Sequence, residues 1–174
     1  MINKCIDEEF ESLIKNILEI KEFQKTISIK HHGISRYEHS LRVAYISYKM
    51  TKFLKLNYKE TTEAALLHDF FLDELEDKNK VSKLMKHPNV AVENASKYID
   101  LTDRQIDIIK NHMFPITFTP PKYLESWIVD IADDISAIYE RTYSAKTQFL
   151  NTMKEASVVG TFFFVLLLNI VKAR

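Results

Sequence analysis

The chain contains very few residues that interrupt a helix, with 2 glycines and 4 prolines among 174 residues. β-Rich folds use Gly and Pro at their many tight turns, and no stretch alternates polar and apolar residues over a useful length. Three of the prolines fall within residues 114–123, which we expect to be a non-helical connection. The length allows one ordinary domain. We therefore predict an all-α, single-domain helical bundle of about six to eight helices over residues 1–174.

Local signals place the expected helices along the chain. Ser35 stands three residues before Glu38, and Thr102 stands three before Gln105, the pattern of a capping box at a helix start. Asn57 and Glu60 repeat this signal before an apolar run. We expect helices over residues 7–24, 36–54, 57–70, 81–86, 88–98, 102–112, 124–142 and 145–172, the last of them apolar. The run AALL at 64–67 is apolar on all sides, which predicts a central position.

Charge and cysteine content limit the expected partners and compartment. Lys plus Arg and Asp plus Glu both total 24, so there is no basic surplus of the kind that nucleic-acid binders carry. We expect no nucleic-acid partner. The one cysteine, Cys5, and a chain start that lacks a secretory signal fit the cytoplasm. The apolar stretch 158–171 falls short of the ~20 residues that span a bilayer, so we expect no membrane partner and a buried helix or homodimer contact there.

Four of the six histidines stand near ends of the expected helices: His39, His68, His87 and His112. A single histidine at a helix end more often interacts with the helix dipole than with a metal. Here Asp69 follows His68 directly, and a later helix carries the aspartate-rich stretch WIVDIADD. Imidazole and carboxylate together suit first-row metals, and a bundle can converge them in its core. We therefore expect a metal site in which Asp69 can bridge two ions and activate a water.

The stretches YEHSLRVA, LLHDF, HPNVAVENA, IIKNHM and IADDI follow one another in the order H…HD…H…H…D. This order resembles the motifs of the HD-domain metal-dependent phosphohydrolase superfamily over residues 36 to about 140. The resemblance implies an all-helical HD-domain fold and six metal ligands, of which two belong to its binuclear branch. These are His39, His68, Asp69 and Asp133, together with His87 and His112 of the binuclear branch.

The last aspartate has three candidates by position, Asp130, Asp133 and Asp134. The superfamily pattern places an Ala-Asp pair in the middle of a helix, which selects Ala132 and Asp133. Asp130 lies one turn earlier on the same face and can support the site. Asp134 is expected to face solvent.

The resemblance implies a phosphatase or phosphodiesterase that acts on a nucleotide or another small phosphorylated metabolite. Its implied cofactors are two divalent ions, Fe or Mn foremost, with Zn, Ni or Mg also compatible. Catalysis would use a metal-activated hydroxide, with His68 and Asp69 at the centre.

One departure concerns substrate binding. Many binuclear relatives continue HD-x-Gly-Lys, whereas this chain continues with Phe70, Phe71 and Leu72. The substrate phosphate must then find its cation elsewhere, and the candidates are Arg36 and Arg42, which flank His39, and Lys86. The two phenylalanines either pack in the core or line an apolar, base-stacking wall.

Two alternatives remain open. Some members of the superfamily, such as the myo-inositol oxygenases, hold two irons with the same ligand types, although the missing lysine counts against this activity. A non-catalytic HD-type module that senses a nucleotide or binds a partner is the other alternative, and six intact ligand positions count against it. His31 and His32 match no ligand position and are expected in a loop.

Overall fold

A computed structural model describes residues 7–31, 33–72 and 80–172, with the side chains of residues 31, 80, 83 and 149–172 left undescribed. The expectations for Cys5 and His32 fall outside these residues. The elements in chain order are α1 (Glu8–Leu18), α2 (Lys21–Gln24), the 3₁₀ helix η1 (Lys25–Ser28), β1 (Lys30–His31), β2 (Ile34–Ser35), α3 (Arg36–Phe53), α4 (Tyr58–Leu67), α5 (Lys80–Ala95), α6 (Asp103–Asn111) and α7 (Leu124–Lys172). The all-α prediction is confirmed.

The short strands β1 and β2 form a two-stranded antiparallel hairpin, with Lys30 opposite Ser35. His31, expected in a loop, therefore lies in a strand. The turn uses Gly33 at φ +93°, a conformation that L side chains rarely adopt, and a Cβ there would meet the Ser144 hydroxyl of α7 at 2.8 Å.

The predicted helix starts of α3, α4 and α6 are confirmed. The side chains of Ser35 and Thr102 each accept a hydrogen bond from the backbone N–H three residues later. The side chains of Glu38 and Gln105 accept hydrogen bonds from the backbone N–H groups of Ser35 and Thr102, which completes two capping boxes. The Asn57 side chain accepts a bond from the backbone of Glu60 at the start of α4. These contacts satisfy backbone N–H groups that a helix start leaves without partners.

Three predicted boundaries are wrong. The helix expected over 7–24 breaks after Leu18, because the chain turns to bury Phe23 against Phe70. The helices expected over 81–86 and 88–98 form one helix, α5, with Pro88 inside it, since both His87 before it and Ala91 after it are buried on the bundle side.

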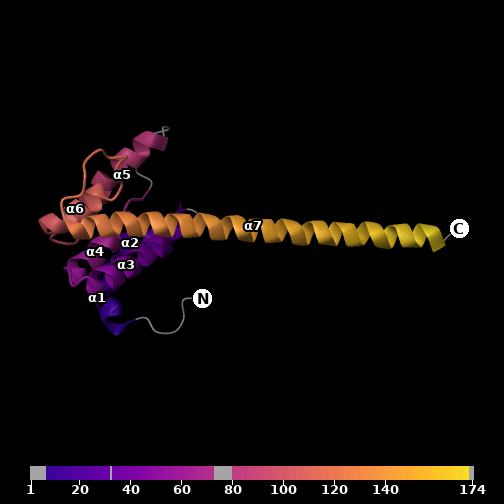
Figure 1. Ribbon diagram of the computed structural model, residues 1–174, viewed down its shortest axis with the longest axis horizontal. Helices are drawn as coiled ribbons and strands as arrows, with labels where there is room; N and C mark the ends of the chain where they lie inside the picture. Colours follow the sequence, from indigo (N-terminus) through magenta and orange to yellow (C-terminus); the bar gives the residue numbers. More distant parts are fainter. Residues whose placement is uncertain (1–6, 32, 73–79, 173–174) are drawn as a thin grey trace.

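The third wrong boundary lies between the helices expected over 124–142 and 145–172. They form the single 49-residue helix α7, because residues 143–146 contain neither Gly nor Pro. Figure 1 shows α7 running along the bundle and then continuing well beyond it. Within the residues that the structure describes, no helix is both long and apolar enough to cross a membrane.

The core lies between α3 and α4 and the helices packed around them. As predicted, α4 is central, because all four residues from Ala64 to Leu67 are fully buried. Other core side chains are Phe10, Ile14, Ile17, Phe23, Val43, Ala44, Tyr48, Phe70, Ala91, Ala95, Ile108, Ile109, Val129 and Ala132. This packing holds the C-terminal ends of α4 and α6 against the N-terminal part of α7.

Candidate metal centre

The structure brings all six predicted ligands together from five helices. His39 lies in the first turn of α3, His87 in α5 and Asp133 in α7, while His68 and His112 cap the C-terminal ends of α4 and α6. Their ligand atoms form three overlapping groups, each within 4.8 Å: His39, His68 and Asp69; His68, His112 and Asp133; and Asp69, His87 and His112. Asp69, His68 and His112 each belong to two of the groups. Of these three, Asp69 alone has two ligand oxygens, so it is the residue that can bridge two ions.

Backbone carbonyls determine which ring nitrogen carries the proton in His68 and His112. His68 Nδ1 lies 2.7 Å from the Ala65 carbonyl, and His112 Nδ1 lies 2.7 Å from the Ile109 carbonyl. A carbonyl only accepts, so each Nδ1 carries the proton and each Nε2 presents a lone pair in the neutral ring. Burial, together with the charges of neighbouring histidines, lowers the pKa of His112 to about 3. A neutral imidazole with Nε2 facing inward is the form that binds metals.

The Nε2 atom of His68 is buried and makes no hydrogen bond within the described residues. Asp133 Oδ1 lies 3.8 Å from it. A buried polar atom without a partner carries a desolvation cost. A cation among these Nε2 and carboxylate atoms would remove that cost, so the donor set fits a metal ion.

His87, His112 and Asp69 form a second converging group. The two Nε2 atoms lie 3.1 Å apart, and Asp69 Oδ1 is 3.2 Å from His87 Nε2 and 3.8 Å from His112 Nε2. His112 carries its proton on Nδ1, so its Nε2 lone pair points at the other two ligand atoms. Three ligand atoms that converge at this spacing suit a divalent ion.

His39 lies between two carboxylates. Its Nε2 is 2.8 Å from Asp133 Oδ1, and its Nδ1 is 3.0 Å from Glu140 Oε2. Burial opposes protonation, but the hydrogen bonds to Asp133 and Glu140 raise the pKa of His39 to about 10. Burial by itself would raise the pKa of Asp133, whereas the hydrogen bond from His39 and the nearby histidines hold it at about 2.

Glu140 is the residue of the site that sequence reasoning missed. Its side chain is only 1% exposed and accepts hydrogen bonds from His39 Nδ1 and, at 2.5 Å, from Arg42 Nη1. A carboxylate on the outer nitrogen of a metal-binding histidine fixes the orientation of the ring. The available signal was spacing, because Glu140 follows Asp133 by two helical turns on the same face of α7.

Arg36 and Phe71 lie at the edge of this cluster. Arg36 Nη1 donates to the Phe71 carbonyl at 2.6 Å, its guanidinium carbon is 3.6 Å from the Phe71 ring centroid, and its Nε is 3.9 Å from Asp69 Oδ2. The Phe71 ring also lies 5.1 Å from the His87 ring. Phe70 instead packs in the core. Of the two phenylalanines, Phe71 alone lies in the wall of the site.

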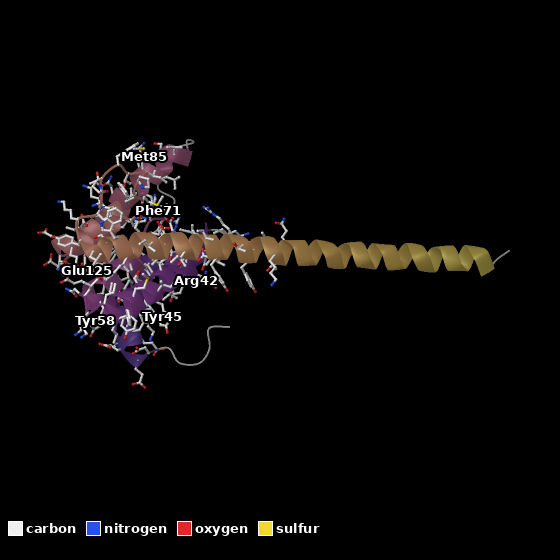
Figure 2. All side chains as sticks on the ribbon, viewed as in Figure 1. Arg42, Tyr45, Tyr58, Phe71, Met85 and Glu125 are labelled. Carbon is white, nitrogen blue, oxygen red and sulfur yellow. The ribbon has the colours of Figure 1, made fainter. Side chains whose placement is uncertain are left out.

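The other two predicted substrate contacts lie farther out. Arg42 binds Glu140 and lies over the Tyr139 ring, near the point where α7 leaves the bundle (Figure 2). Lys86 is exposed on α5, one residue before His87. A role for Arg36, Arg42 or Lys86 in substrate binding stays a prediction.

The remaining two aspartates of α7 differ in their surroundings. Asp130 is buried one turn before Asp133, and the pKa of its carboxyl is raised to about 7 by burial and by the charges of Asp134 and Asp133. Asp134 is exposed, as expected. Asp133 is thus the aspartate of this helix that meets the histidines.

The model of the family described as "HD domain" matches residues 36–138. The chain belongs to the HD domain family. No curated protein and no solved structure matches the chain. HD domain proteins are mostly metal-dependent phosphohydrolases, and the His and Asp groups found here are compatible with a divalent metal. The HD domain match contains all six clustered ligands and ends just before Glu140.

Proposed function

We propose that this HD domain protein is a metal-dependent phosphohydrolase that acts on a nucleotide or another small phosphorylated metabolite. One observation carries the proposal. Six ligands from five helices converge in three overlapping groups, two of which contain Asp69. The backbone carbonyls that hold Nδ1 of His68 and His112 leave the Nε2 lone pairs of these rings facing the cluster.

The residues suggest how two divalent ions would be held. His39, His68 and Asp133 would bind on one side of Asp69, and His87 and His112 on the other, with Asp69 shared. His112 would bind a single ion, because its Nδ1 carries a proton and only its Nε2 offers a lone pair. When bound, such ions supply an activated water and balance charge on the transferring phosphoryl group. Two carboxylates and neutral imidazoles leave two divalent ions with a surplus of positive charge, which favours an anionic substrate such as a phosphate ester.

Arg36 is the cation that we propose in place of the lysine found after the HD pair in many relatives. Its guanidinium is held over Phe71 and faces Asp69 Oδ2 from the start of α3. A planar guanidinium suits phosphate oxygens. Phe71 fixes this group because it offers both its ring and its carbonyl.

Metal analysis of anaerobically purified protein, followed by a panel of phosphatase and phosphodiesterase substrates with Mn or Fe, tests the proposal. His68→Ala and Asp69→Ala should lose both the metal and the activity. Asp134→Asn, which alters an exposed carboxylate beside Asp133, is the matched control and should keep both. Activity retained in either alanine variant would refute the site assignment.

The same experiment separates the alternatives. Turnover that requires oxygen and two irons per chain would indicate an HD-type oxygenase. A protein that holds no metal and hydrolyses nothing with added Mn or Fe would indicate a non-catalytic nucleotide-sensing or interaction module.

A further inference from the structure

Helix α7 has two different faces along the bundle. Its inner face carries Asp133 and Glu140 toward the cluster, between small buried residues such as Ala132. Its outer face carries Ile131, Ile135 and Ile138, which are 46%, 48% and 64% exposed. A surface helix normally presents polar residues on its outer face, so these isoleucines are out of place in an isolated chain.

The exposed apolar residues form a continuous stripe. Leu124 and Trp127 are also exposed, and the series 124, 127, 131, 135, 138 repeats every three or four residues, as one face of a helix does. Single exposed apolar residues are common, whereas an aligned stripe over four turns marks an interaction surface. We call these five residues the outer stripe.

The second half of α7 is apolar in sequence and lies beyond the bundle. Residues 156–171 contain no charged residue, and Figure 1 shows this part of α7 projecting away from α1–α6. The chain's own bundle therefore does not cover it. Among the residues that the structure describes, no element covers the outer stripe, and helices α1–α6 do not reach the apolar second half of α7.

We propose that a second copy of the chain covers both surfaces, with two α7 helices paired antiparallel along their full length. The helix spans residues 124–172, so its midpoint is residue 148. At 100° per residue, positions 156, 160, 163 and 167 continue the face of the outer stripe into the second half of the helix. A two-fold axis at the midpoint places Ile131 between positions 163 and 167 of the other copy, and Ile138 between positions 156 and 160. The projecting half of each helix then lies on the outer stripe of the other, and the assembly closes as a dimer.

The charges agree with this register. Arg141 falls opposite Glu155 of the other copy, which places an attractive pair on each side of the midpoint. The chain as a whole has a formal net charge of zero, which leaves no overall repulsion between copies. A second copy therefore covers both halves of the helix at once, which a partner that binds one half does not.

The first test is the oligomeric state of the full-length protein by analytical ultracentrifugation. The wild-type chain should be a dimer at micromolar concentration. The triple variant Ile131→Glu, Ile135→Glu, Ile138→Glu should raise the dimer dissociation constant by roughly 100-fold or more, because it places charges in an apolar contact. Phe53→Glu, at another exposed apolar residue, should leave the dimer intact. Far-ultraviolet circular dichroism checks that each variant is folded.

The second test is disulfide cross-linking in a Cys5→Ser background. A mixture of Ile131→Cys chains and Leu167→Cys chains should cross-link into heterodimers, while either variant alone should not. The two copies of position 131 would be ~51 Å apart in the antiparallel pair, at 1.5 Å per residue. Cross-linking of Ile131→Cys with itself would indicate a parallel pair and overturn the proposal. A monomeric wild-type chain, or a monomer that co-sediments with phosphatidylcholine vesicles, would overturn it as well.

Discussion

Replacing Asp107 by alanine should sharply reduce the free energy of unfolding, because this buried carboxylate ties α6 to the start of α7. Its Oδ1 accepts a bond from Asn111 Nδ2 at 2.7 Å, and its Oδ2 accepts bonds from the Lys122 backbone N–H at 2.9 Å and the Ser126 hydroxyl at 2.7 Å. Hydrogen bonds to a charged group are worth about 1.5–3 kcal/mol each. Their sum is an upper bound, since water can reach the exposed Lys122 segment. We expect a loss of about 3–5 kcal/mol.

Asp107→Asn is the informative companion variant. The amide keeps one acceptor oxygen but turns an N–H₂ group toward donors, so the loss should fall to about 1–2 kcal/mol. Urea titration should show a lower midpoint with an unchanged slope. Asp103→Ala, in the exposed first turn of α6, should cost no more than about 1 kcal/mol. A loss below about 1 kcal/mol for Asp107→Ala, or equal losses for alanine and asparagine, would refute this reasoning.

Three further predictions follow from the site and the hairpin. Because the pKa of His39 is about 10, Mn²⁺ binding at about pH 7.5 should release about one proton. Calorimetry in two buffers of different ionisation enthalpy measures this release. Glu140→Gln should lower the pKa of His39, as an NMR titration would show. The pKa of His112 is lowered from 6.5 to about 3, so its contribution to stability is present above pH 6.5 and is lost as pH falls toward 3. Urea titrations of the metal-free protein at several pH values should show this loss, and His112→Asn should reduce it. Gly33→Ala should cost about 1–2 kcal/mol in thermal unfolding because of its positive φ and the Ser144 contact.

Local patterns in the sequence were enough to predict most helix starts and the chemistry of the site. A capping box such as Ser35 with Glu38 involves residues three apart, so it is visible without the rest of the fold. The order of histidines and aspartates along the chain resembles the HD-domain motifs, and this resemblance indicated the six residues that the fold brings together. Their clustering could therefore be predicted from the sequence.

What could not be predicted depends on contacts between distant residues. Pro88 reads as a helix start, yet burial on both sides of it keeps α5 continuous. Glu140 reads as one more charge on a long helix until His39 and Arg42, about a hundred residues earlier, are seen to hold it. Likewise, no local sequence pattern around Asp107 predicts its hydrogen bonds with Lys122 and Ser126.

The position of His68 at the end of α4 restricts how this helix can change in length. The other end is also fixed, because the Asn57 backbone N–H donates to Glu125 of α7 at 3.2 Å. Adding or removing one residue within α4 would rotate His68 by ~100° and shift it by ~1.5 Å relative to that anchor. The residues before His68 are buried on every side, so no rotation is neutral. Homologues that keep this centre should therefore vary in the amino acids of α4 but not in its number of residues.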